Sequence, residues 1–202
     1  MSIYLGSNLV MWNKTVEVID ENLKKIVDRT IETYSNDEVE NIRPYAFAHC
    51  SSLTSLNLPQ ARHVDNYAFA YCSSLSMMNL PQVNYVGNYA FAHCYSLTSL
   101  NLSHVTYIGD YAFYRCSSLT TVNLPQVSYI GSSAFFSCNN LFSLYLLSNS
   151  IVSLGNTDTF NYTPISTAIS GIYGSIYVPS SLYSTYLTTN NWSNFSSRFV
   201  SM

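Results

Sequence analysis

Cysteine occurs five times in this chain, and each copy stands 22 residues after the one before it, at Cys50, Cys72, Cys94, Cys116 and Cys138. Phenylalanine keeps the same interval at Phe47, Phe69, Phe91, Phe113 and Phe135, and leucine does so at Leu53, Leu75, Leu97, Leu119 and Leu141. A fixed period over more than half of the chain indicates a solenoid, in which each repeat is one coil. A single coil cannot bury its apolar residues alone, so stability must come from stacking equivalent side chains of successive coils.

Each repeat also contains a strand pattern. The apolar residues follow the leucine-rich signature L-x-x-L-x-L, which in the first repeat reads Leu53-Thr54-Ser55-Leu56-Asn57-Leu58. Its last three residues alternate with the period of a β-strand, and equivalent strands of successive coils would lie about 4.8 Å apart. The return segment, Tyr-Ala-Phe-x-x-Cys, is too short for a full helix and predicts turns or a 3₁₀ turn. We therefore predict a right-handed leucine-rich repeat solenoid with one short parallel strand per coil.

The ends of such a solenoid need covering, and we expect one domain over residues 1–202. Residues 1–40 would form an N-terminal cap and an incomplete repeat, residues 41–152 five 22-residue repeats, and residues 153–202 a degenerate repeat and a C-terminal cap. Within residues 16–29 apolar side chains recur at helical spacing between charged ones, which predicts an amphipathic helical cap. At the other end we expect a last strand at 175–178, a short helix capped by Ser180 or Ser181, and a cover made by Trp192, Phe195 and Phe199.

Charge limits the classes of partner. The formal net charge is −3, and 13 of the 19 charged residues lie between Lys14 and Arg43. Nucleic acids and anionic membranes need clustered Lys and Arg, so we expect neither as a partner. No apolar run is long enough to span a bilayer, and no signal peptide or anchor is recognisable, so we expect no membrane insertion. The remaining surface is rich in Ser, Thr, Asn and Tyr.

No group of residues suggests catalysis or metal binding. Cysteines in register stack in a line and cannot converge on one zinc ion, so we expect buried free thiols. His49 and His93 share a register, but Tyr71 occupies the coil between them and keeps them about 10 Å apart. There is no glycine-rich phosphate loop and no nucleophile with a partner base. The sequence predicts no enzyme, and it predicts no catalytic, cofactor-binding or metal-binding residues.

Two columns of residues are candidates for a binding face. Outward positions of the predicted strands form an uncharged, hydrogen-bonding strip of Asn57, Asn79, Asn101, Asn123 and Tyr145. The alternative is that these asparagines bond one another and only satisfy the sheet.

The second column consists of Tyr67, Tyr89 and Tyr111, with Tyr45 before them, and a further column contains Tyr85, Tyr107 and Tyr129. Tyrosine offers rigid, amphipathic contact area at low entropic cost, which suits a binding surface. The alternative is that stacked Tyr rings only cover the Phe and Ala side chains beneath them.

The repeat resembles the BspA-like leucine-rich repeat family of bacteria, whose unit reads approximately I-G-x-x-A-F-x-x-C-x-x-L-x-x-L-x-L-P. The third repeat carries this pattern from Val86 and Gly87 through Ala90, Phe91 and Cys94 to Leu102. The resemblance implies an extracellular or surface-displayed protein of host-associated bacteria or their prophages, engaged in adhesion or protein contact. The absence of a signal peptide leaves the cytoplasm or a phage particle open as locations.

We therefore expect a non-enzymatic adhesion or recognition module that binds a host or bacterial surface protein or glycan. The alternative is a structural accessory of a larger assembly, such as a phage tail. The sequence leaves the identity of the ligand and the oligomeric state open.

Overall fold

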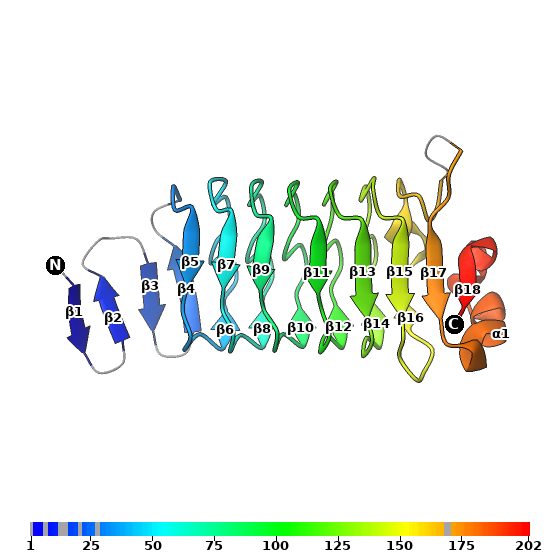
Figure 1. Cartoon of the computed structure of the whole chain (residues 1–202), viewed down its shortest axis with the longest axis horizontal. Coiled ribbons are helices and arrows are strands. Elements are labelled where there is room, and N and C mark those ends of the chain that lie inside the picture. Colours follow the sequence, from blue (N-terminus) through cyan, green and yellow to red (C-terminus); the bar gives the residue numbers. More distant parts are fainter. Residues whose placement is uncertain (1, 6–7, 12–15, 20–21, 27–28, 168–170) are drawn as a thin grey trace.

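The computed structural model describes residues 2–5, 8–11, 16–19, 22–26, 29–167 and 171–202, and it describes side chains from Arg29 onward, except that of Asn101. The coils are stacked along one long axis, with the two ends of the chain at opposite ends of the molecule (Figure 1). The predicted solenoid is confirmed: equivalent strands of successive coils pair in parallel at the 22-residue offset, as in Leu100 beside Val122.

The strands predicted from the leucine-rich signature form what we call the front sheets. The first has three strands and the second has five, and every strand pair in both is parallel. In the strands of the repeats the leucine column points inward and the Asn column outward. The strands of the front sheets are β5 (Thr33–Ser35), β7 (Ser55–Asn57), β9 (Met77–Asn79), β11 (Ser99–Asn101), β13 (Thr121–Leu124), β15 (Ser143–Leu146), β17 (Ser175–Val178) and β18 (Phe199–Ser201).

Each coil has a second strand, so the prediction of one strand per coil was incomplete. These strands are only two residues long, too short to give an alternating pattern in the sequence. Each consists of an outward residue followed by an inward Val, Ile or Leu, and together they form what we call the back sheet. Its strands within the coils are β6 (Asn41–Ile42), β8 (His63–Val64), β10 (Tyr85–Val86), β12 (Tyr107–Ile108), β14 (Tyr129–Ile130) and β16 (Ser153–Leu154).

Turns connect each back strand to the next front strand, as predicted. Their backbone amides bond to the next coil, for example from Phe91 N to Ala112 O at 2.8 Å. In each of the five repeats, two residues of the turn adopt left-handed backbone conformations, such as Tyr89 with φ 55° and His93 with φ 63°. Non-glycine residues rarely adopt these values.

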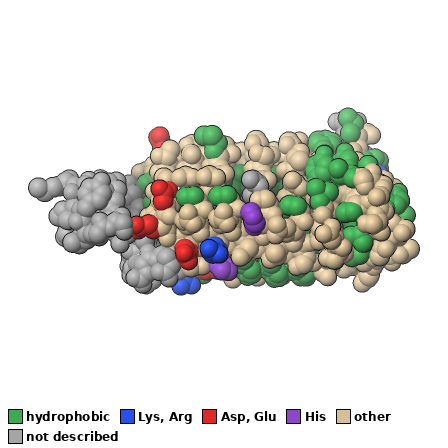
Figure 2. Space-filling view, turned by 60° about the horizontal axis from the view of Figure 1, so that its bottom comes forward, with side chains coloured by type: hydrophobic (Ala, Val, Ile, Leu, Met, Phe, Trp, Pro, Cys, Tyr) green, Lys and Arg blue, Asp and Glu red, His purple; other side chains and the backbone are tan. Residues whose placement is uncertain are grey.

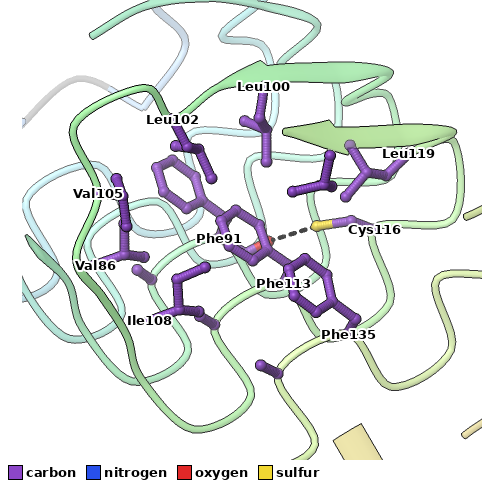
Figure 3. Packing of buried hydrophobic residues seen from close by; sticks show 14 of the residues in the cluster. Val86, Phe91, Leu100, Leu102, Val105, Ile108, Phe113, Cys116, Leu119 and Phe135 are labelled. Atoms are coloured by element: carbon purple, nitrogen blue, oxygen red, sulfur yellow. Dashed lines mark hydrogen bonds between the residues drawn. The ribbon is translucent and has the colours of Figure 1, made fainter. Parts of the chain in front are cut away.

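The Phe, Leu and Cys columns form the core. The rings of Phe91, Phe113 and Phe135 stack nearly parallel, with centroids 5.3 and 5.2 Å apart (Figure 3). The thiols of Cys72, Cys94, Cys116 and Cys138 each donate to a carbonyl of the preceding coil, as from Cys116 Sγ to Phe91 O at 3.1 Å. All five cysteines are buried and none forms a disulfide bond, as predicted. The core is therefore continuous along the solenoid, and no coil is packed independently of its neighbours.

The helix predicted over residues 16–29 is wrong. The described residues there form β3 (Val16–Ile19) and β4 (Asn22–Ile26), which pair antiparallel, and β4 then pairs with β6. β-Branched residues at 16, 18 and 19 favour strands, and without β4 the edge of the back sheet at β6 would be unpaired. An antiparallel pair, β1 (Ser2–Leu5) and β2 (Asn8–Met11), precedes these strands.

The C-terminal cap matches the prediction in its main parts. The 3₁₀ helix η1 (Thr157–Phe160) brings Phe160 onto the end of the Phe stack, 5.8 Å from Phe135. After β17 come α1 (Ser180–Thr188) and the 3₁₀ helix η2 (Trp192–Arg198). Trp192 is buried, and its Nε1 donates to Val152 O at 2.6 Å.

The predicted serine N-cap of the C-terminal helix is wrong. Pro179 occupies the N-cap position of α1, and no side chain caps the helix. Ser180 lies inside the helix, and its backbone N donates to Met202 O at 2.9 Å. The end of the chain therefore anchors the start of this helix, next to β18.

Candidate binding surfaces

The asparagines of the outward strip lie on the front sheets, as the strand pattern predicts. Asn79 Nδ2 donates to Asn57 Oδ1 at 2.6 Å, and Asn57 Nδ2 donates to Ser35 Oγ at 2.9 Å. Asn123 is exposed on β13, and Asn101 pairs through its backbone with Asn123. Asn57 and Asn79 thus bond one another, which is the structural role considered for this strip as the alternative to binding. Their remaining polar atoms still face outward.

The strip changes character at its C-terminal end. Tyr145 stacks on Tyr177 of β17, with centroids 4.4 Å apart and ring planes 8° apart. Val200 follows in the same register on β18 and is 38% exposed. Charged side chains gather toward the N-terminal part of the face in Figure 2, and hydrophobic ones toward its C-terminal end. Tyr145 therefore belongs to an aromatic and apolar end of the strip, unlike the amides before it.

Tyr67, Tyr89 and Tyr111 form, with Tyr45, what we call the tyrosine ladder. Successive centroids are 5.0, 4.8 and 4.7 Å apart, and successive ring planes lie within 6° of parallel. The ladder lies on the turns that follow the back strands, whereas the Asn strip lies on the front sheets. The predicted binding face is therefore two separate surfaces.

Tyr89 of the tyrosine ladder is uncharged at neutral pH. Burial raises the pKa of Tyr89 above its ordinary value of 10.0, and the neighbouring Tyr111 and Tyr67 raise it further. A neutral phenol both donates and accepts hydrogen bonds. At Tyr89 the ladder thus combines a stacked apolar ring with a neutral hydroxyl group.

A second set of stacked tyrosines lies on the back sheet. Tyr85, Tyr107 and Tyr129 are spaced by 5.0 Å at each step, and His63 lies 6.0 Å from Tyr85 at a tilt of 48°. These residues are the outward members of two-residue strands with ordinary strand backbones. They differ from the ladder in this respect, because every ladder residue has a positive φ.

The sequence did not predict a third aromatic stack. His49, Tyr71 and His93 lie in one line, with centroids 4.7 and 4.4 Å apart, so Tyr71 separates the two histidines as expected. Beside the stack is a groove of about 350 Å³ lined by His49, Ser51, Tyr71, Ser73 and Tyr95. The signal that would have found it is Tyr95, which interrupts a column that holds serine at 51, 73 and 117.

The cysteine column offers no reactive thiol. Burial raises the pKa of Cys94, Cys116 and Cys138 well above the usual range, so these thiols stay protonated at neutral pH. Only the thiolate is a good nucleophile or metal ligand. In the described part of the chain, no three His, Cys, Asp or Glu side chains are placed to hold a metal ion together. The described helices also include none with the length and apolarity to cross a membrane.

The fold is that of a leucine-rich repeat solenoid. It has parallel strands that recur in every coil, an inward leucine column and a cap at each end. Comparison with protein families gives a more specific result. Residues 40–166 match six copies of the BspA type leucine rich repeat region, which is more than half of the chain. The protein belongs to this family. No curated protein has a sequence that matches it.

Two solved structures are similar to this one. A leucine rich cell surface protein from Faecalibacterium prausnitzii A2-165 is 25% identical, with a TM-score of 0.58, and the likeness covers 64% of this chain and 35% of that one. This chain therefore spans about a third of that protein's length. The leucine rich repeat protein of T. pallidum is 18% identical, with a TM-score of 0.51, and the likeness covers 75% of this chain and 82% of that one. The second likeness supports the fold alone.

Proposed function

We propose that this protein is a non-enzymatic recognition module of a bacterial surface, which binds a host or bacterial surface protein or glycan through its tyrosine ladder. The observation that carries this proposal is the backbone at the ladder. Tyr45, Tyr67, Tyr89 and Tyr111 have φ values of 62°, 59°, 55° and 55°. Four successive coils thus place an aromatic ring where glycine or asparagine fits with less strain.

A left-handed backbone costs a non-glycine residue about 1 kcal/mol or more. Side chains held in strained backbone conformations cluster at functional sites. The turn itself requires this backbone, since Ser133 at the equivalent position of the next coil has φ 54°, so what needs an explanation is the choice of tyrosine and not the conformation. Stacking within the ladder offsets part of this cost, at about 0.5–1.5 kcal/mol per aromatic pair. None of the four rings is fully buried in return, since Tyr45 is 56% exposed and Tyr67, Tyr89 and Tyr111 are half-buried. Contact with a partner would explain why tyrosine occupies these positions.

The surroundings of the ladder suit a partner that is recognised without strong charge. Tyrosine is enriched in binding surfaces because it provides rigid area together with a polar group. The Asn strip on the front sheets would add hydrogen bonds to a large partner that reaches both surfaces. The Faecalibacterium prausnitzii protein is described as a cell surface protein, and its likeness to this chain supports a location at the cell surface.

A substitution that removes the rings and keeps the backbone tests the proposal. Asparagine adopts left-handed conformations readily, so Tyr67→Asn, Tyr89→Asn and Tyr111→Asn together should leave the coils intact. We expect the purified wild-type chain to retain an extracellular-matrix protein or a mucin in a pull-down. In the triple variant the Kd for that partner, measured by biolayer interferometry, should rise at least about tenfold, the effect of losing about 1.4 kcal/mol.

The back sheet provides a matched control. Tyr85→Thr, Tyr107→Thr and Tyr129→Thr remove the same number of stacked rings from strand positions, where threonine is well tolerated. This control should bind like the wild type. Equal binding by wild type and ladder variant would overturn the proposed surface. Absence of any binding, together with stable oligomers in sedimentation, would instead favour the assembly role.

A further inference from the structure

The groove beside the His49, Tyr71 and His93 stack exists because of one residue. In the column at positions 51, 73, 95, 117 and 139, the other coils carry Ser51, Ser73, Ser117 and Asn139, which are short. Tyr95 is much longer and is 41% exposed. It lines the groove together with His49, Tyr71, Ser51 and Ser73. The resulting space of about 350 Å³ is within the range of small-ligand sites.

Tyr95 is held in position by its neighbours. Its hydroxyl lies 2.7 Å from Nδ1 of His93, and the two rings meet edge to face, with centroids 5.6 Å apart. His93 itself stacks on Tyr71 and meets Tyr114 edge to face. Burial lowers the pKa of His93, and Arg115 lowers it further, so the imidazole is neutral at neutral pH. The wall of the groove is therefore fixed before any ligand arrives, which reduces the entropic cost of binding.

The groove is lined mainly by residues with hydroxyl groups. Four of the five lining residues carry a hydroxyl group, namely Ser51, Ser73, Tyr71 and Tyr95, and the fifth is His49. Among the described residues, the side-chain hydroxyls of Ser51 and Ser73 have no protein partner. Each hydroxyl both donates and accepts hydrogen bonds, and the aromatic rings between them present apolar carbon. No carboxylate, lysine or arginine is among the lining residues.

We infer that this groove binds the ring of a neutral saccharide. A sugar ring alternates hydroxyl groups with apolar C–H groups, which matches a wall of alternating hydroxyls and aromatic carbon. A cationic ligand would find no carboxylate in the lining and an anionic one no lysine or arginine, and a purely apolar ligand would leave the serine hydroxyls unsatisfied. The inference rests on the proposed recognition function, and it assigns a glycan contact on the turn side of the solenoid, separate from the tyrosine ladder.

Titration of the whole chain with free sugars tests the groove. The probes are glucose, galactose, N-acetylglucosamine and lactose, and the readouts are saturation-transfer NMR of the sugar and shifts of the His49 and His93 ring protons. Tyr95→Ser restores the residue found in three other coils, so the fold should persist. We expect at least one sugar to shift these histidine signals and its Kd to rise about tenfold or more in the variant. Tyr162→Ser, at a tyrosine that is 64% exposed and outside the groove, should bind like the wild type.

The outcomes separate this inference from the proposed function. A wild-type chain that leaves all four sugars unbound, or a Tyr95→Ser variant that binds as well as the wild type, overturns the groove. If such a chain still retains a mucin or matrix protein through Tyr67, Tyr89 and Tyr111, the proposed function stands without the groove. Sugar binding that disappears in Tyr95→Ser, in a chain whose ladder variant binds its macromolecular partner normally, supports the groove and overturns the ladder.

Discussion

The free energy of unfolding should fall by about 5 kcal/mol per pH unit in alkaline solution, because four buried thiols, Cys72, Cys94, Cys116 and Cys138, cannot ionise without unfolding. Burial raises the pKa of all four above the ordinary value of 9.0. In the unfolded chain the same thiols lose their protons near that value. The contribution of each thiol to stability is therefore fully present below about pH 9 and is lost as the pH rises further.

The size of this effect follows from proton counting. Each thiol that is ionised in the unfolded chain and protonated in the folded one contributes about 1.4 kcal/mol per pH unit. Urea unfolding in the presence of a reducing agent, at steps between about pH 9 and pH 10, measures the slope. Over this range the unfolded thiols go from about half to about nine-tenths ionised, so the average slope there should be about 4 kcal/mol per pH unit, and it approaches about 5 only at higher pH.

A double variant identifies the groups responsible. Cys94→Ala with Cys116→Ala removes two of the four thiols and should halve the slope, even if the variant is less stable at neutral pH. Leu97→Ala is the matched control, since it truncates a fully buried side chain that cannot ionise, and it should lower stability without changing the slope. An unchanged slope in the double variant would contradict the assignment to the cysteine column.

Phe91→Ala should destabilise the protein by about 3–5 kcal/mol. Phe91 is 1% exposed and lies between Phe69 and Phe113, so its removal leaves a cavity closed on both sides. The packing around it already includes an apolar cavity of about 10 Å³, which Met78 and Leu100 also line. The cavity lies where the front sheets are interrupted, between β9 and β11. Neighbouring backbone hydrogen bonds limit how far the coils can collapse into the space.

Denaturant unfolding at neutral pH measures this change, and Phe136→Ala is the matched control. Phe136 is adjacent in sequence to the buried Phe135 but is only half-buried, so its removal should cost much less. A loss well under 1 kcal/mol for Phe91→Ala would mean that the Phe column does not carry the core.

The fold could be predicted largely from the repeat, because burial at a fixed period leaves a strong pattern in Phe, Leu and Cys. The N-terminal cap could not be predicted in this way. Ile19, Leu23 and Ile26 fit the spacing of a helix, and β-branched Val16 and Val18 fit a strand equally well. Pairing of β4 with the exposed edge of β6 decides between them, and this is a tertiary effect that local spacing does not contain.

The candidate surfaces could be predicted in part. The sequence identified the Asn and Tyr columns, but not that they lie on different sides of the coil, since that depends on the second strand. It also contained no sign of the left-handed backbone at Tyr89, because glycine and asparagine are the residues that usually mark such positions. The groove depends on a single departure from the column pattern, at Tyr95, and averaging over repeats hides such a residue.

Hydroxyl-radical labelling of the chain, alone and with the matrix protein or mucin that it retains, tests most directly whether the tyrosine ladder carries recognition. We expect Tyr67, Tyr89 and Tyr111 to be protected in the complex, and Tyr85, Tyr107 and Tyr129 on the back sheet to be labelled equally in both samples. Protection confined to other residues, with the ladder labelled equally in both samples, would contradict the account.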